Sequence, residues 1–289
     1  MKILGIGEIV LDKIYNLPHN IIEWQKIQSQ WNTISVGGPV PAALKLLKNL
    51  WYDVTFIWSI WDNINGKYIR AYLNSYQIAT EFIYDNDTKS NTILINQQNG
   101  ARTIIRDVNK NSLIEKIPLK LIIEADAIIF DRHEPKAFDF VMEHKKEDTI
   151  IVFDPSTEWS DKIIHMAKNI DYPIFPIETF EKLLEGASLE EQCKEMYKLL
   201  GKTFVITDGS KWSYTYDGKE IIKTPVIDIK PVDSNGAGDV FRGGFMYGLL
   251  QWWELQKIMK FANVVAGLQC KREGNLTAIP AEEEIFDIL

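Results

Sequence analysis

The segment of this sequence best suited to chemistry is a helix that begins on small residues and carries an early carboxylate. Apolar side chains at positions 241, 245 and 249 recur every four residues, which predicts a helix from about residue 238 onward. Gly236-Ala237-Gly238 then lies at the helix N-terminus, where the first backbone N–H groups lack partners within the helix and the dipole adds partial positive charge. Because small residues let an anion approach this backbone closely, the segment predicts a phosphate cradle that needs no lysine.

Asp239 follows in the first helical turn and has two interpretations. Its carboxylate could simply complement the helix dipole, which is a structural role. Beside an anion-binding backbone it could instead accept the proton of an attacking hydroxyl, while the N–H groups take up charge that develops on a transferred phosphoryl group. Phosphoryl transfer depends mainly on such positioning and electrostatics. The residues alone leave both interpretations of Asp239 open; in the second, Gly236, Ala237 and Gly238 form an anion hole.

Short apolar runs that alternate with amphipathic ones surround this segment. The runs predict buried strands at Ile3–Ile6, Val54–Ile57, Ala127–Phe130, Thr149–Phe153, Ile174–Phe175 and Thr203–Ile206. Between them the spacing predicts helices at Ala42–Leu50, Gly66–Tyr76, Pro135–His144, Asp161–Asn169, Glu178–Leu184 and Leu189–Leu200. Repeated strand–helix–strand order is typical of a mostly parallel sheet covered on both faces, so we expect an α/β fold.

Two segments break this alternation. Residues 13–35 are polar and aromatic, and residues 82–106 alternate apolar and polar side chains with Gln97-Gln-Asn-Gly100 as a turn. The period of two predicts a hairpin with one exposed face. We expect these pieces to form a small β-rich lid over a ligand site, within a single domain that spans residues 1–289.

The bulk properties exclude several classes of protein. A net charge of −8 disfavours a general partner for nucleic acid or membrane surfaces, which require a basic face. The four histidines show no zinc-ligand spacing, and the two cysteines, Cys193 and Cys270, form no CxxC pair. The sequence begins as a strand, without the apolar run of a signal peptide or a membrane span, so we expect a cytoplasmic protein.

Motifs spread along the chain resemble those of one enzyme family. Asp233-Ser-Asn-Gly-Ala-Gly-Asp-Val-Phe resembles the C-terminal signature of the ribokinase-like (PfkB) carbohydrate kinases, and Ser35-Val-Gly37-Gly38-Pro resembles their paired-glycine motif. Asp12, Thr207-Asp-Gly209, and Phe261-Ala-Asn263 with Arg272-Glu-Gly274 match further family positions in the expected order. The resemblance covers essentially the whole chain.

The resemblance implies a ribokinase-like three-layer α/β/α sandwich with a β-rich lid and a phosphotransferase that uses ATP with Mg²⁺. The implied roles are Asp239 as the base, Asp12, Gly37 and Gly38 at the hydroxyls of the acceptor, Thr207, Gly209 and Asn263 on the nucleotide side, and Asp233 and Asn235 in a loop that binds a monovalent cation such as K⁺ in many members. Members of the family often pair through their lids, which makes a homodimer one expected assembly.

Polar residues near the expected lid and strand ends are further candidates for binding the acceptor. Arg102 and Arg106 lie on the expected lid, although arginines on a hairpin are usually solvated. His133 and Glu134 follow one buried strand and Asp154 follows another, and ligands collect at the carboxyl ends of parallel strands. A site rich in acids and amides favours a polyhydroxyl acceptor.

Some family positions are altered. The asparagine that follows the paired glycines is replaced by Pro41 or Ala42. The family's Asn-x-x-Glu motif, which organises magnesium and phosphates, aligns with Ile177 and Phe180, or with Glu178 and Glu181 after a shift of one residue. The altered motif keeps the magnesium arrangement open.

Tryptophan stands at several positions where the family favours glycine, namely Trp51, Trp58, Trp61 and Trp212. Glycine in such turns usually supplies a positive φ or close backbone approach. One hypothesis is that these positions are glycine in the living organism, through a reassigned codon. The alternative is drift with repacking around the larger side chain.

The leading hypothesis is an ATP-dependent kinase for a hydroxyl of a sugar or sugar-like molecule. A nucleoside kinase of the same family is the first alternative, and an aromatic pair on the lid would favour it. A non-catalytic protein that binds a sugar or a nucleotide is the second, motivated by the altered Asn-x-x-Glu motif. A dinucleotide dehydrogenase fits poorly because Gly5-Ile-Gly7 opens no GxGxxG motif.

Overall fold

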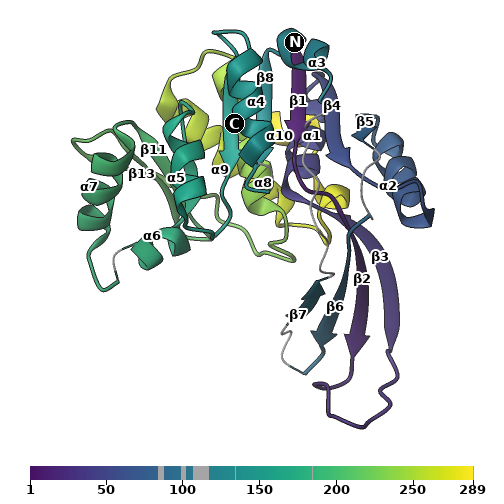
Figure 1. The fold of residues 1–289 in the computed structure, drawn as a ribbon. Helices are drawn as coiled ribbons and strands as arrows, with labels where there is room; N and C mark the ends of the chain where they lie inside the picture. The colour runs from purple at the N-terminus through teal and green to yellow at the C-terminus, as the bar shows by residue number, and fades with distance from the viewer. Residues whose placement is uncertain (84–87, 99–101, 107–116, 134, 184, 289) are drawn as a thin grey trace.

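A parallel sheet of five strands forms the centre of the molecule (Figure 1), with the strand order β5-β4-β1-β8-β9. The computed structural model describes residues 1–83, 88–98, 102–106, 117–133, 135–183 and 185–288. The strands of this sheet are β1 (Lys2–Ile6), β4 (Asp53–Ser59), β5 (Ala79–Ile83), β8 (Ala127–Asp131) and β9 (Ile150–Asp154). β8 is buried throughout, as expected for a parallel strand covered on both faces.

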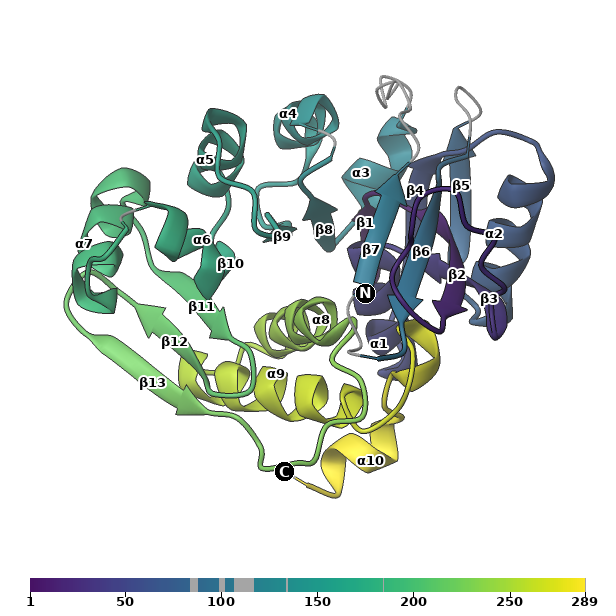
Figure 2. The same cartoon turned by 90° about the horizontal axis from the view of Figure 1, so that it is seen from below.

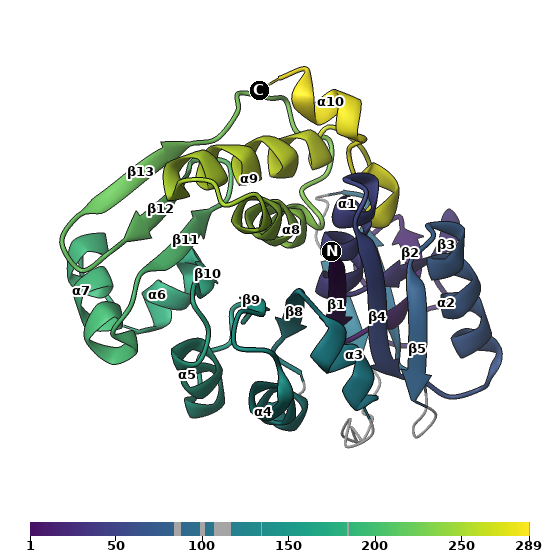
Figure 3. The same ribbon diagram turned by 90° about the horizontal axis from the view of Figure 1, so that it is seen from above.

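Helices cover both faces of this sheet (Figures 2 and 3). One face carries α1 (Pro39–Asn49) and α8 (Ala237–Leu250), with α9 (Leu255–Gln269) packed on α8, and the other carries α3 (Leu119–Glu124), α4 (Pro135–His144) and α5 (Asp161–Lys168). α2 (Ile64–Ser75) flanks the β5 edge. Paired glycines let α8 pack closely against two neighbours, since a Cβ on Gly243 would lie 3.0 Å from the Ala43 carbonyl oxygen and one on Gly244 2.5 Å from Val265.

A second sheet of four strands continues the molecule beyond β9, in the order β10-β11-β12-β13. It comprises β10 (Ile174–Pro176), β11 (Phe204–Asp208), β12 (Trp212–Tyr216) and β13 (Ile221–Pro225), of which only β10 and β11 run parallel. α6 (Ile177–Leu183) and α7 (Leu189–Leu200) pack beside it, and a short 3₁₀ turn (Leu276–Ala278) and α10 (Glu282–Phe286) end the chain.

The lid is a third sheet, which projects from the body at the lower edge of Figure 1. Its strand order is β3-β2-β6-β7, with β2 (Val10–Leu17), β3 (Trp31–Gly37), β6 (Ser90–Asn96) and β7 (Arg102–Arg106). β2–β3 and β6–β7 pair antiparallel, whereas β2 and β6 join the two pairs in parallel. Asn99 and Gly100 of the predicted turn lie outside the described residues.

The α/β fold, its parallel sheet and its β-rich lid are thus confirmed. α4 and α7 have the predicted bounds, and α7 begins with a capping box in which Ser188 Oγ accepts from the N–H of Glu191 at 3.3 Å. The antiparallel strands β12 and β13 and the edge strand β5 were not predicted from the sequence. Within the described ranges, each helix is too short or too polar to cross a membrane.

Candidate active site

The face of the lid that points into the molecule carries a polar row across all four strands. The strand registers align Asp12 with Ser35 on one side and with Asn91 on the other, and Asn91 with Arg106. Asn91 Nδ2 donates to Asp12 Oδ1 at 2.9 Å. Burial raises the pKa of Asp12, and the hydrogen bond from Asn91 opposes the shift. The row therefore presents carboxylate, amide and guanidinium groups side by side, which suits a ligand with several hydroxyls.

A second polar group forms where the adjacent strands β1 and β8 end. Asp131 Oδ2 accepts from the N–H of Glu8 at 2.5 Å, and its Oδ1 accepts from the N–H of His133 at 2.9 Å. Glu8 in turn accepts from Lys89 Nζ at 2.6 Å and from His133 Nε2 at 3.0 Å. Burial lowers the pKa of His133 to about 4, so the ring is neutral near pH 7 and Nε2 carries the donated hydrogen.

The third component is the N-terminus of α8, which begins at Ala237, one residue earlier than predicted. Gly236 is its N-cap with φ 81°, and a Cβ there would lie 2.5 Å from Asn275 Oδ1, so the turn requires glycine. Asp239 lies in the first turn, where burial, followed by the negative charge of Asp154, raises its pKa. A carboxylate with a raised pKa is a stronger base, which suits general base catalysis.

One cavity of about 1110 Å³ joins these three components. Its lining includes seven of the residues predicted from the sequence: Asp12, Gly37, Gly38, His133, Asp233, Asn235 and Asp239. Asp154 and Arg106 line it too. The lid therefore faces Asp239 across a space large enough for a small polar molecule.

The loop that precedes α8 packs against the loop that follows α9. Asp233 accepts from the N–H of Asn235 through Oδ1 and from the N–H of Gly274 through Oδ2, both at 3.0 Å. Two buried amide oxygens at this junction, Gln269 Oε1 and Asn275 Oδ1, have no hydrogen-bond partner among the described residues. Such oxygens fit a hard cation, and Asp233, Asn235 and Asn275 are the residues that would hold K⁺ here.

For divalent metals, the described part of the chain contains no group of three or more His, Cys, Asp or Glu side chains arranged to hold an ion. In its ungapped alignment, the altered Asn-x-x-Glu motif provides no polar side chain for a metal, because its two positions are apolar: Phe180 is fully buried and Ile177 packs against the core. Glu178 is exposed on α6, and the side chain of Glu181 lies outside the described residues.

The residues expected on the nucleotide side lie apart from the cavity lining. Thr207 is on β11, and Gly209 follows it in a turn with φ 50°. Asn263 is only 4% exposed, and its Nδ2 donates to Ser213 Oγ and to the Pro225 carbonyl oxygen, both at 2.9 Å. Asn263 thus fixes α9 against β12 and β13.

Two candidate residues cannot be placed in the site. The backbone of Arg102 pairs with Ile95 on the lid, but its side chain lies outside the described residues, as does Glu134. Contributors missing from the predicted set include Glu8, Lys89, Asn91, Arg242 and Asn275. Asn91 meets Asp12 only through the parallel pairing of β2 with β6, which leaves no local signal in the sequence. Glu8 lies two residues after the end of β1, as His133 does after β8, and its position near a strand end could have identified it from the sequence.

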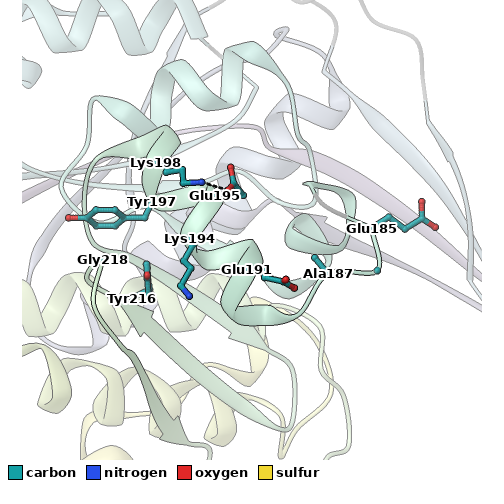
Figure 4. Close-up of a pocket in the computed structure, with 10 residues that line it drawn as sticks. Glu185, Ala187, Glu191, Lys194, Glu195, Tyr197, Lys198, Tyr216 and Gly218 are labelled. Carbon is teal, nitrogen blue, oxygen red and sulfur yellow. Dashed lines mark hydrogen bonds and ion pairs between the residues drawn. The ribbon is translucent and has the colours of Figure 1, made fainter.

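A second cavity of about 770 Å³ lies beside α7 (Figure 4). Most of its charged groups are engaged with one another or with the backbone: Lys194 pairs with Glu190 at 2.6 Å, Lys198 pairs with Glu195, and Glu191 caps α7 through Ser188. The residues predicted to act in chemistry lie outside this cavity, so the cavity under the lid is the candidate active site.

Solved structures with this architecture include ribokinases and also nucleoside kinases. The chain matches a ribokinase from Thermotoga maritima with a TM-score of 0.86 at 21% identity, covering 99% of this chain and 98% of the other. It matches an Arabidopsis thaliana ribokinase complexed with ribose and ATP with a TM-score of 0.86 at 16% identity, covering 99% and 97%. The fold is therefore the ribokinase fold.

The sequence comparison identifies the family. Residues 2–282 match the pfkB family of carbohydrate kinases, and the chain belongs to this family. A 5-dehydro-2-deoxygluconokinase from Clostridium botulinum is 25% identical over 100% of this chain and 92% of its own length. An ATP-dependent 6-phosphofructokinase from Thermoanaerobacterium thermosaccharolyticum is 22% identical over 96% and 90%. The protein is thus an ATP-dependent carbohydrate kinase.

Proposed function

We propose that this kinase transfers the γ-phosphate of ATP to a hydroxyl of a sugar or sugar acid held under the lid, with Asp239 as the base. One observation carries the proposal: Asp239, at the N-terminus of α8, and Asp12, on the lid, line the same cavity. A hydroxyl held by Asp12 and Asn91 can therefore face Asp239. The predicted anion hole, Gly236, Ala237 and Gly238, directly precedes Asp239 in the chain but is not among the residues that line the cavity.

The chemistry follows from the charges at this helix terminus. Asp239 accepts the proton as the hydroxyl oxygen bonds to phosphorus, and ADP leaves with the electron pair of the broken P–O bond. The N–H groups at the start of α8 and the helix dipole stabilise the charge on the transferred group. Magnesium, when bound with ATP, offsets the negative charge of the phosphates. Asp233 and Asn235 would hold a monovalent cation beneath the cradle.

The lid row favours acceptors that carry a negative group as well as hydroxyls. Asp12 and Asn91 can bind hydroxyls as acceptor and donor, and Arg106 is exposed and lines the same cavity. Guanidinium groups pair well with carboxylate or phosphate. The names of two relatives agree with this chemistry, since one acts on a deoxygluconate derivative and the other on a phosphorylated fructose.

The test is ADP release from Mg-ATP with neutral sugars, sugar acids, sugar phosphates and nucleosides, each with and without potassium. We expect one sugar or sugar acid to dominate and turnover to fall by about 10²–10⁴-fold in Asp239→Asn with ATP affinity preserved. Undiminished turnover in that variant would remove Asp239 from the mechanism. A dominant nucleoside would replace the sugar assignment, and ATP binding without turnover for any acceptor would indicate a binding protein.

A further inference from the structure

Arg242 is a buried arginine near Asp239 that has no role in the proposed phosphoryl transfer. Arg242 is on α8, one turn after Asp239, and is only 5% exposed. Arginine is seldom so buried unless it is paired, because an isolated charge is costly to remove from water. The groups that pair with Arg242 should therefore indicate the function of its positive charge.

The guanidinium of Arg242 contacts three parts of the site. Nη2 lies 2.9 Å from Asp154 Oδ1, and Nη1 lies 3.9 Å from Asp239 Oδ1. Nη1 also lies 3.2 Å from the position that a Cβ on Gly238 would occupy, so the positive charge reaches the anion cradle. One side chain thus links the base, a second carboxylate and the phosphate cradle.

Asp154 is itself held firmly in place. It ends β9, lines the cavity, and accepts from the N–H of Ser156 at 2.7 Å through the same Oδ1 that contacts Arg242. The central sheet therefore fixes Asp154, and Arg242 extends that fixed point to the first turn of α8. Rotation of Arg242 away from this position would leave the buried carboxylate of Asp154 facing the partly buried carboxylate of Asp239.

Building on the proposed function, we propose that Arg242 is a positioning residue that locks Asp239 to Asp154 and lends positive charge to the Gly236–Gly238 cradle. Arg242 keeps the base oriented toward the acceptor and offsets the repulsion between the two carboxylates. Removal of Arg242 should therefore disturb the base even though Arg242 itself touches no substrate in this arrangement.

Asp239 has one negative and one positive neighbour, so removal of either neighbour should shift the pKa of Asp239, and the two shifts should have opposite signs. Asp154 raises the pKa of Asp239 and Arg242 lowers it. The other titratable and charged groups that line the cavity come from every surrounding element: Glu8, Asp12, Lys89, Arg106, Arg132, His133, Asp233 and Glu273. Removal of the acid should make Asp239 easier to ionise, and removal of the arginine should make it harder.

The experiment compares Asp154→Asn, Arg242→Gln, Arg242→Lys and the double variant Asp154→Asn/Arg242→Gln. The primary readout is the pKa of Asp239 from ¹³C NMR titration of labelled carboxyl groups, assigned with Asp239→Asn, because it does not depend on turnover. The second readout is the acid limb of the pH profile of kcat/KM. Thermal unfolding checks that each variant is folded. If Arg242→Gln does not fold, the double variant still provides a test, because it removes both buried charges of the Asp154–Arg242 pair together.

We expect the titration of Asp239 to move by about one pH unit, downward in Asp154→Asn and upward in Arg242→Gln, with Arg242→Lys in between. In the double variant the shifts should largely cancel. In variants with measurable turnover, the acid limb of the kcat/KM profile should shift in the same direction as the titration of Asp239. The fold decrease in kcat should exceed the fold increase in KM for ATP. Unchanged titration in the folded single variants, or a net shift of one unit or more in the double variant, would overturn the proposal. A kinase that fails for all acceptors would contradict the proposed function but leave the titration result interpretable.

A second inference rests on an independent observation, the way in which two helices end. After α1, Trp51 N–H donates to the Lys48 carbonyl oxygen at 3.1 Å and Tyr52 N–H to that of Leu47 at 3.0 Å. After α8, Trp252 N–H donates to the carbonyl oxygen of Leu249 at 3.0 Å and Trp253 N–H to that of Gly248 at 3.1 Å. Both patterns are Schellman motifs, whose closing residue is left-handed and usually glycine.

Both closing residues are tryptophans in the left-handed region. Of the four tryptophans named at family glycine positions, only Trp51 is left-handed, because Trp58, Trp61 and Trp212 do not have a positive φ. Trp51 has φ 68° and Trp252 has φ 56°, and each side chain is 81% exposed. Trp24 repeats the combination, with φ 65° and full exposure. Three of the five non-glycine residues with positive φ in the described structure are thus tryptophan, although tryptophan makes up only nine of 289 residues. Chance placement of a bulky residue does not favour these positions.

We infer that the source organism inserts glycine at Trp51 and Trp252, through a codon that is conventionally translated as tryptophan. The test is peptide mass spectrometry of the protein isolated from its source. Peptides that cover both positions with the mass of glycine would support the inference, and a tryptophan mass at either position would overturn it.

Discussion

Replacement of Trp252 by glycine should stabilise the protein, because Trp252 is held in a backbone conformation that penalises a Cβ. The left-handed conformation costs an L-residue about 1–2 kcal/mol. Glycine loses roughly 0.5–1 kcal/mol more backbone entropy on folding than alanine does. The difference favours Trp252→Gly by about 0.5–1 kcal/mol, and the exposed indole contributes little burial to lose.

The assay is equilibrium unfolding by heat and by urea. At about 2–4 °C per kcal/mol for a chain somewhat smaller than this one, the midpoint should rise by about 1–3 °C. Trp252→Ala is the matched control, since alanine removes the indole but keeps the Cβ, and it should leave the midpoint unchanged. An equal gain from alanine and glycine would refute the backbone explanation, as would a loss of stability in Trp252→Gly.

The adjacent tryptophan provides a control of opposite sign. Trp253 is half-buried, and its ring lies 5.5 Å from that of Tyr247 and 5.3 Å from that of Phe261. Trp253→Gly should therefore cost about 2 kcal/mol or more through lost packing. The same change at successive positions would raise stability at one and lower it at the next.

Three further predictions concern the site. Arg106→Gln should raise KM for an acceptor with a carboxylate by about tenfold, measured by ADP release. The control Lys13→Gln removes a charge from the opposite face of the lid and should leave this KM unchanged. Equal effects of the two substitutions would refute a specific role for Arg106. Burial raises the pKa of Asp131 to about 8, so the folded protein binds this proton more tightly than the unfolded chain, and the contribution of Asp131 to stability should rise as pH falls from 8 toward 4, whereas the lowered pKa of His133 acts in the opposite direction. The difference in urea midpoint between the unaltered protein and Asp131→Asn should therefore change with pH, and a difference independent of pH would count against this assignment. Gly38→Ala should destabilise the protein by about 2 kcal/mol in thermal unfolding, because φ at Gly38 is 130° and a Cβ would collide with the Glu8 carbonyl oxygen. An unchanged unfolding midpoint would contradict this prediction and show that the turn relaxes around the added Cβ.

Local patterns in the sequence were sufficient for much of the fold. Apolar runs located β1 and β8, and the 3.6-residue period located α4 and α7, because these elements bury one stripe or both faces. Asp239 was found for a similar reason: a helix start, small residues and a carboxylate are consecutive in the chain. The structure places Asp239 at the N-terminus of α8, but its role stays a prediction.

Long-range relations were not accessible in this way. Asn91 and Asp12 are 79 residues apart, and only the parallel pairing of β2 with β6 makes them neighbours. Arg242 has an unremarkable place on an apolar helix, and its importance appears only when β9 brings Asp154 against α8. Periodicity identifies the buried face of an element but does not identify the element that packs against it.

The connection of the lid has a consequence for folding. Each hairpin of the lid is local in sequence, but β2 can pair with β6 only after α1, β4, α2 and β5 have brought them together. Pairing at such separation is slow, because the entropy of loop closure is lost before the contacts form. We expect the lid to order after the central sheet and to open first in native-state hydrogen exchange. A bound acceptor would then slow exchange in β2 and β6 selectively, since it contacts the two strands that are last to associate.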